Sequence, residues 1–217
     1  MSTRYFAPVC LYPHTKYRTI DGVTNLFKTF EFQKHCYLIV IADRLLALDN
    51  LVTGRYWSST SVVSKARADA CQIYNLIKRV SCRAKAQEHG KIVYWDDIAE
   101  TGNYNEFSRR MRSGFTMEPA LLRAVEDFAA RRVEKFGLGQ SVEKERNFEL
   151  EYLLSEVCMS VYCTEVLGYW EEIWERPPPG DVPDPLKLLY TDHPEIIRRT
   201  TGHAPRRVLR FLYEPVS

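Results

Sequence analysis

A phenol and a carboxylate stand one helical turn apart late in the chain, at Tyr152 and Glu156. Residues at i and i+4 lie one above the other on a helix face, so Glu156 can accept or hold a proton within reach of the phenol. Tyr and Glu at this spacing are also common as a surface contact on an amphipathic helix. The pair alone therefore leaves both interpretations open, proton handling and a surface contact.

The segment from Asn147 to Gly168, NFELEYLLSEVCMSVYCTEVLG, must position this pair, and its apolar spacing predicts a helix. A stripe of leucines and valines recurs at helical spacing beside the pair, which predicts that the helix is anchored against a core. The members of this stripe are Leu150, Leu153, Leu154, Val157 and Val161.

Three carboxylates follow a predicted short strand at Lys91–Tyr94, in the run DDIAE that contains Asp96, Asp97 and Glu100. Asp96 or Asp97 can cap a following helix, with Glu100 completing an arrangement like a capping box. Carboxylates also bind a guanidinium, a permanent cation whose planar fork fits them through two hydrogen bonds. Helix capping and cation recognition remain alternatives for this run.

Cys10 lies near the carboxyl end of a predicted strand, Arg4–Leu11. Ligands of open α/β sheets bind in the crevice beyond the carboxyl ends of the strands. A thiol in that crevice can act as a nucleophile when its pKa is lowered. A cysteine at the end of a buried strand is, however, more often a core residue, so both roles stay open for Cys10.

The first part of the chain predicts a βαβ unit. The strand Arg4–Leu11 is followed by a helical pattern at Asp21–Phe32, with Asp21 or Thr24 as its cap, and by the apolar run Cys36–Ala42. A continuous apolar run of this length suits a strand that is covered on both faces. Units of this type almost always pair their strands in parallel through a right-handed crossover.

The rest of the chain alternates helices and strands. Five prolines and a glycine between Glu175 and Pro185 exclude a helix or a central strand, so this stretch is predicted to be a loop. The length of 217 residues favours one α/β domain that spans residues 1–217, with a mainly parallel sheet between helix layers. The remaining predicted elements are helices at Ser58–Glu88, Tyr104–Met111 and Glu118–Phe136, a short helix or turn at Leu45–Val52, and strands at Leu186–Tyr190 and Val208–Tyr213.

Composition excludes several classes of protein. No apolar run approaches the roughly 20 residues of a membrane span, and the first residues lack the apolar stretch of a secretory signal. Six cysteines without a C-x-x-C pair favour free thiols in a reducing compartment, which makes the cytoplasm the default location. The sequence has no H-E-x-x-H motif and neither type of glycine-rich phosphate loop, so we expect no metal and no nucleotide cofactor.

A nucleic-acid partner is suggested by clustering of charge rather than by the net charge of +2. Four cations crowd the last turns of the predicted helix at Ser58–Glu88: Lys78, Arg79, Arg83 and Lys85. Favourable interaction with the negative end of the helix dipole explains such a cluster equally well.

The run YLLSEV from Tyr152 to Val157 resembles the helix motif Y-x-x-x-E-x-P of the tRNA-dependent cyclodipeptide synthases. The resemblance extends over most of the chain, and it departs from the motif at Cys158, where the family has proline. The family's nucleophilic serine, which follows the first strand, corresponds to Cys10 here, so a thiol replaces a hydroxyl. Tyr190, in KLLYTDHP, resembles the second tyrosine of the family's site.

Within this family the chain is most similar to a fungal branch that makes arginine-containing cyclodipeptides, because that branch carries a DD-x-x-E motif. The resemblance implies one Rossmann-like domain, similar to the catalytic domain of class I aminoacyl-tRNA synthetases. It also implies that arginyl-tRNA and a second aminoacyl-tRNA are joined into a cyclo(Arg-Xaa) diketopiperazine. Asp96, Asp97 and Glu100 would then contact the arginyl side chain, the tRNA 3′ end or a catalytic water.

Two other functions stay open. The chain can be a non-catalytic tRNA-binding α/β module that keeps the shape of a synthetase, or it can transfer a single aminoacyl group from tRNA to another acceptor. Tyr152, Glu156 and the acidic run together favour an enzyme over the binding module. The sequence does not identify the second amino acid.

Overall fold

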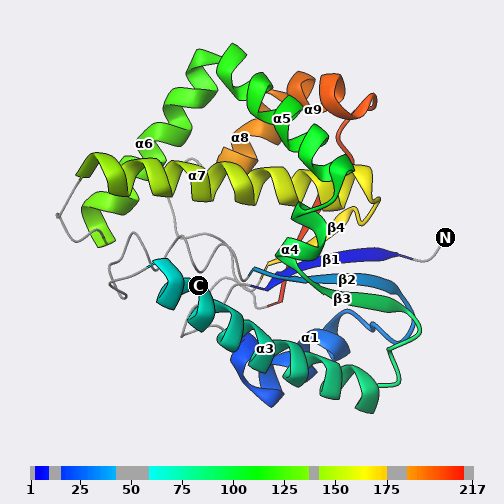
Figure 1. Cartoon of the computed structure of the whole chain (residues 1–217). Coiled ribbons are helices and arrows are strands. Elements are labelled where there is room, and N and C mark those ends of the chain that lie inside the picture. The colour runs from blue at the N-terminus through cyan, green and yellow to red at the C-terminus, as the bar shows by residue number, and fades with distance from the viewer. Residues whose placement is uncertain (1–2, 10–15, 43–58, 137–141, 175–184, 213–217) are drawn as a thin grey trace, which may run out of the picture.

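A computed structural model describes residues 3–9, 16–42, 59–136, 142–174 and 185–212 (Figure 1). Within these residues five strands form one sheet in the order β3-β2-β1-β4-β5, and all neighbouring pairs are parallel. This order reverses at β1, as it does in doubly wound nucleotide-binding folds. The strands are β1 (Arg4–Val9), β2 (Cys36–Ile41), β3 (Gly90–Tyr94), β4 (Glu171–Trp174) and β5 (Val208–Phe211).

Strand β2 shows why the sheet needs helices on both sides. Leu38 and Val40 point into one hydrophobic core, whereas Tyr37, Ile39 and Ile41 point into another. All five side chains are buried. The prediction of a strand that is covered on both faces is confirmed.

One face of the sheet is covered by α1 (Ile20–Thr29) and α3 (Ser59–Arg83) (Figure 1). The short 3-10 helix η1 (Lys16–Arg18) precedes α1 in the chain. The side chain of Thr19 accepts a hydrogen bond of 3.1 Å from the Gly22 N–H and so caps α1. The expectation of Asp21 or Thr24 as the cap is therefore wrong, because the helix begins one residue before Asp21.

The remaining helices lie on the opposite side of the sheet, where α7 packs on α5 and α6 (Figure 1). None of the helices in the described ranges is both long enough and apolar enough to cross a membrane. These helices are α4 (Trp95–Ala99), α5 (Gly102–Met117), α6 (Pro119–Phe136), α7 (Val142–Val161) with its continuation η2 (Tyr162–Val166), α8 (Pro185–Thr191) and α9 (Pro194–Thr201).

The predicted strand at Leu186–Tyr190 is wrong, because these residues belong to helix α8. Leu186 and Leu189 are buried at a spacing of three, and Pro185 begins the helix, where its missing N–H costs no hydrogen bond. A short apolar run has the same composition in a strand and in a buried helix, so periodicity did not separate the two.

Strand β4 and helix α9 are among the elements that were not predicted. Strand β4 reads Glu-Glu-Ile-Trp, and two adjacent carboxylates are atypical of a buried strand. Helix α9 begins at Pro194 and is capped at its carboxyl end by Gly202, whose φ of 83° is a backbone conformation that glycine adopts readily. The predicted strand at Val208–Tyr213 is confirmed for Val208–Phe211, and the short helix or turn predicted at Leu45–Val52 lies outside the described residues.

Gly90 allows β2 and β3 to approach each other, and we expect Gly90→Ala to destabilise the fold. A Cβ atom at this position would overlap the Tyr37 carbonyl oxygen and ring, so the strands would have to separate. Overpacking of this kind costs about 1–3 kcal/mol. Gly102→Ala is the matched control, because nothing lies within 4 Å of the position of its Cβ. Denaturant unfolding of both variants measures the difference, and equal midpoints would contradict the prediction.

Candidate functional site

Helix α7 carries a row of three carboxylates and a phenol on one face. Glu145, Glu149, Tyr152 and Glu156 are separated by four, three and four residues, which places them along one line of the helix. Glu145 is 6% exposed, Glu149 1% and Tyr152 4%, and Glu156 is half-buried. The surface-contact interpretation is therefore wrong for Tyr152.

The two buried glutamates were not singled out in the sequence. Their signal was present, since Glu145 and Glu149 continue the spacing of Tyr152 and Glu156 toward the amino terminus of the helix. In a chain with 27% charged residues, glutamates in a helix are usually exposed, so spacing alone gave no reason to expect burial. The row therefore places two buried carboxyl groups on the same helix face as the phenol.

The apolar stripe that anchors α7 is confirmed. Leu153, Val157 and Val161 are buried in the core on this face of the sheet, and Leu150 and Leu154 pack against it. The helix then continues into η2, a π-helical turn of a kind that is frequent near functional sites.

Cys158 stands where the resemblance places a proline, and the structure places its thiol in the core. The side chain is fully buried, and burial raises the pKa of the thiol to about 11. Burial likewise raises the pKa of Cys163 well above its usual value. Both cysteines are therefore packing residues.

The acidic run forms helix α4 directly after β3. Asp97 accepts a hydrogen bond of 2.8 Å from the backbone N–H of Tyr94, which is the N-cap residue of the helix. The prediction that Asp96 or Asp97 is itself the N-cap is wrong, because the N-cap lies two or three positions earlier. The Asp97 side chain nevertheless accepts the hydrogen bond of a backbone N–H at the start of the helix. Asp96 pairs with Arg67 of α3 at 3.6 Å, and Glu100 is an exposed residue at the end of the helix.

Helices α4 and α7 meet in one hydrophobic core, in which Trp95 and Ile98 are buried together with Tyr152. The carboxyl ends of three strands form a row at this edge of the sheet, because Val9 pairs with Ile41 and Ile41 with Tyr94. The chain leaves β1 at the same edge, and Cys10 itself lies outside the described residues.

Tyr190 is located on α8, where its hydroxyl lies 3.1 Å from that of Thr164 in η2. Burial raises the pKa of Tyr190 well above its usual value, so the phenol stays protonated at neutral pH. Thr164 lies twelve positions beyond Tyr152, about 18 Å along the helix at 1.5 Å per residue. Tyr190 therefore contacts the π-helical continuation of α7, beyond the turn that carries Tyr152 and Glu156.

A buried charge network holds this second tyrosine. Glu172 of β4 pairs with Arg207 and accepts hydrogen bonds from the Ser160 hydroxyl at 2.8 Å and the Trp174 indole at 2.9 Å. The Arg207 guanidinium lies 5.0 Å from the centre of the Tyr190 ring. Glu172 is 1% exposed, so the network fixes the end of α7 against β4 and β5.

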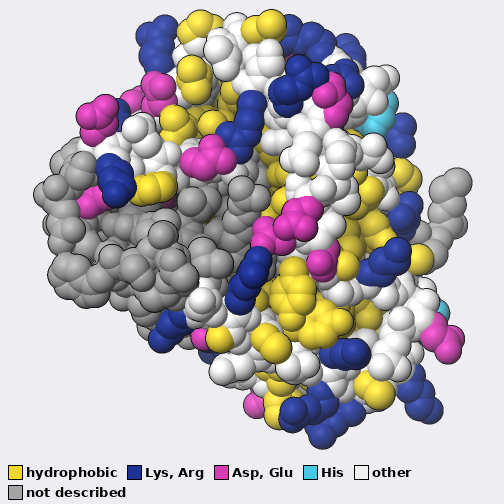
Figure 2. Space-filling view, in the orientation of Figure 1, with side chains coloured by type: hydrophobic (Ala, Val, Ile, Leu, Met, Phe, Trp, Pro, Cys, Tyr) yellow, Lys and Arg dark blue, Asp and Glu magenta, His cyan; other side chains and the backbone are white. Residues whose placement is uncertain are grey.

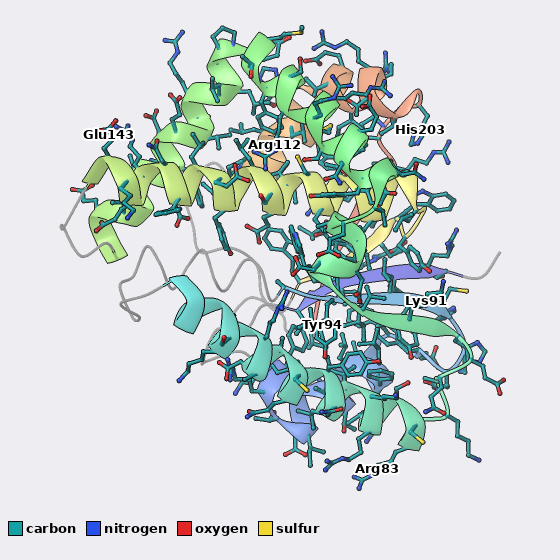
Figure 3. All side chains as sticks on the ribbon, viewed as in Figure 1. Arg83, Lys91, Tyr94, Arg112, Glu143 and His203 are labelled. Atoms are coloured by element: carbon teal, nitrogen blue, oxygen red, sulfur yellow. The ribbon has the colours of Figure 1, made fainter. Side chains whose placement is uncertain are left out.

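The four cations predicted to bind tRNA are all exposed and lie at the carboxyl-terminal end of α3, on the opposite face of the sheet from α7 (Figure 3, which labels Arg83). Lys78, Arg79 and Arg83 belong to the helix, and Lys85 follows it with a φ of 54°. A nucleic acid on these residues reaches α7 only around an edge of the sheet.

The described residues also contain two cavities and one group of potential metal ligands. A cavity of about 440 Å³ follows the outer face of α7, and one of about 250 Å³ lies between α5 and α9. Glu118, His193 and Glu195 bring potential metal ligands within 4.8 Å of one another. Glu118 also pairs with Arg199 at 3.4 Å, so it already has a cationic partner.

No protein-family model matches the chain, and no curated protein matches it by sequence. The structure is similar to a cyclodipeptide synthase from Fluoribacter dumoffii, with a TM-score of 0.68, 15% identity, and coverage of 95% of this chain and 89% of that one. A Mycobacterium tuberculosis protein, whose structure relates cyclodipeptide synthetases to type I tRNA synthetases, gives a TM-score of 0.67 at 13% identity, with coverage of 98% and 83%.

A third similar structure is a cyclodipeptide synthase from Candidatus Glomeribacter gigasporarum bound to Phe-tRNAPhe, with a TM-score of 0.61, 13% identity, and coverage of 97% and 87%. At these identities the comparisons show the fold. The chain therefore has the Rossmann-like α/β fold that cyclodipeptide synthases share with class I tRNA synthetases, as the sequence predicted.

The burial of Cys158 and Cys163 predicts that neither thiol reacts in the folded protein. A thiol with a pKa of about 11 is ionised in about one molecule in a thousand at pH 8, and only the thiolate is alkylated. Brief treatment with iodoacetamide followed by peptide mass spectrometry should modify the exposed Cys71 and Cys82 first. Alkylation after unfolding is the control, and rapid modification of Cys158 in the folded chain would contradict the prediction.

Proposed function

We propose that this chain is a tRNA-dependent cyclodipeptide synthase, that it works as one catalytic domain over residues 1–217, and that arginyl-tRNA is one of its substrates. The observation that carries the proposal is the placement of Tyr152 and Glu156 on α7, with the phenol buried at 4% exposure, in a fold shared with cyclodipeptide synthases. A buried phenol beside a half-buried carboxylate suits the handling of a proton on an α-amine.

Arginine as a substrate is supported by acidic side chains at two places. Glu145 and Glu149 extend the row of Tyr152 and Glu156 as buried carboxylates. Asp96 pairs with the Arg67 guanidinium at 3.6 Å, a contact of the kind that an arginyl side chain would make with this run. A guanidinium stays charged at any physiological pH and forms paired hydrogen bonds with carboxylates, so both places suit an arginyl side chain.

The reaction consists of two acyl transfers and a ring closure. The sulfur of Cys10 attacks the carbonyl carbon of the arginyl ester and forms a thioester. The ester C–O bond breaks, and the first tRNA leaves with its hydroxyl protonated by the proton of the thiol. The α-amine of the second aminoacyl-tRNA attacks the thioester, forms an amide and releases the thiol. The free amine of the resulting dipeptidyl-tRNA attacks the remaining ester, which closes the diketopiperazine and releases the second tRNA. If Cys10 is only a pocket wall, the arginyl group stays on its tRNA until the amine attacks.

Glu156 acts on the amine in this scheme. It holds the incoming α-ammonium through a charge-assisted hydrogen bond and then takes its proton, so that the free amine attacks the carbonyl carbon. Tyr152 lies one turn away on the same face and orients the amine. The four exposed cations Lys78, Arg79, Arg83 and Lys85 neutralise tRNA phosphates.

A cyclo(Arg-Xaa) product is expected in the medium of a heterologous host that expresses the wild-type chain, detected by mass spectrometry. Glu156→Gln should lower its yield by about a hundredfold or more, because general base catalysis contributes about 10²–10⁴. Glu143→Gln, an exposed residue of the same helix, is the matched control. Tight tRNA binding without any diketopiperazine would instead indicate a binding module. An undiminished yield from Cys10→Ala would rule out the covalent step, but it would leave the rest of the proposed function standing.

Asp96 and Asp97 are expected to contribute to the choice of arginine. The double variant Asp96→Asn, Asp97→Asn keeps an acceptor oxygen for the Tyr94 N–H but removes both charges. We expect the purified variant to consume arginyl-tRNA about tenfold more slowly or worse, since each charged hydrogen bond contributes about 1.5–3 kcal/mol. Glu106→Gln, an exposed residue of α5, is the control. An unchanged preference for arginyl-tRNA would exclude this role.

A further inference from the structure

Two tyrosines stack on each other where α3 meets the end of β3. The rings of Tyr74 and Tyr94 are 5.1 Å apart at an interplanar angle of 20°, and both side chains are half-buried. Tyr94 is the last residue of β3 and directly precedes α4, and both rings pack against the core on the α1 and α3 face of the sheet. Figure 2 shows hydrophobic side chains gathered over this junction, with Lys and Arg side chains around them.

A flexible cation lies over the Tyr74 ring. The ammonium of Lys78 is 5.7 Å from the centre of this ring, one turn further along α3, and the Lys78 side chain is exposed. An exposed cation–π contact is worth only about 0.5–1 kcal/mol, so a flat ligand can displace it. A nucleobase that stacks on an aromatic side chain contributes about 1–3 kcal/mol, and the displaced ammonium is then available to a neighbouring phosphate.

The cations of α3 lie on one side of the tyrosine pair, and an ion pair lies on the other. Lys78 and the other exposed cations follow Tyr74 toward the carboxyl end of α3, and Arg83 lies about 13 Å along the helix from Tyr74. On the other side Arg67 and Asp96 form an ion pair between α3 and α4. Phosphates therefore fit the side of Lys78, and the Arg67–Asp96 ion pair lies toward the carboxyl ends of the strands.

We propose that Tyr74 and Tyr94 form a stacking platform for an unpaired base near the 3′ end of a tRNA. This proposal rests on the proposed function, in which an aminoacyl-tRNA delivers its ester to the α7 face of the sheet. The tRNA phosphates lie on the cations of α3, and the base stacks on Tyr74. The 3′ end of the tRNA then continues past α4 toward Tyr152. The β3 edge thus connects the cationic surface on one face with the acidic row on the other.

The stacked pair can be tested with an RNA hairpin that ends in an unpaired 3′ extension, in which 2-aminopurine replaces one base. Binding to the wild-type protein should quench the fluorescence of this base, which reports stacking without any substitution. Tyr74→Leu keeps apolar volume but removes the ring, and we expect it to weaken binding roughly 5- to 100-fold. Tyr74→Phe keeps the ring and should bind like the wild type.

Tyr169→Leu is the matched control, because Tyr169 is also half-buried and also carries a cation over its ring, that of Arg4 at 4.5 Å. Tyr169 precedes β4 and therefore lies at the amino ends of the strands, whereas Tyr94 lies at a carboxyl end. Loss of its ring should therefore not change RNA binding. Thermal melting of Tyr74→Leu and Tyr74→Phe checks that both variants are folded. A blunt-ended hairpin should bind equally to the wild type and to Tyr74→Leu.

Absence of quenching in the wild-type protein, or equal affinity of Tyr74→Leu and Tyr74→Phe for the extended hairpin, would overturn the platform. If the wild type still forms a diketopiperazine in that case, the platform fails while the proposed function stands. Quenching that depends on Tyr74 in a protein that forms no diketopiperazine would support the platform and refute the synthase.

Discussion

Parallel pairing throughout the described sheet is the constraint on which the other features depend. Parallel neighbours cannot be joined by a tight hairpin, so each connection crosses a face of the sheet through at least one helix. Both faces are covered as a result, and β2 is apolar along its whole length. All strands also end at one edge, and this is where the chain leaves Val9, where α4 begins after Tyr94, and where a nucleophile at Cys10 would be expected.

The central part of the fold could be predicted because its signals are local. The apolar run at Cys36–Ala42, the helical spacing that follows it, and the turn residues between elements each indicate one type of structure. The errors occurred where a distant contact decides the outcome. Residues 186–190 form a helix because Leu186 and Leu189 pack into the core, and Glu172 enters a buried strand because Arg207, Ser160 and Trp174 satisfy its carboxylate.

The candidate site shows the same limit. Spacing identified Tyr152 and Glu156 as neighbours on one helix face, but it could not show that the phenol is buried or that Glu145 and Glu149 are buried with it. Burial is a property of the assembled helices, and no local pattern in a glutamate-rich helix reports it. Asp96 and Asp97 each have a structural partner, Arg67 and the Tyr94 N–H, that lies far away in the sequence or depends on the backbone geometry of the helix start.

The position of β1 has a consequence for how the chain folds during synthesis. One side of β1 pairs with β2, which follows it closely, but the other side pairs with β4, which begins only at Glu171. At roughly 5–20 residues per second, β4 leaves the ribosome on the order of ten seconds after β1. During that interval the backbone N–H and C=O groups on one side of a central strand have no strand to pair with, and another nascent chain can occupy them. The late pairing makes the strand in the middle of the finished sheet its most aggregation-prone edge while the chain is being made.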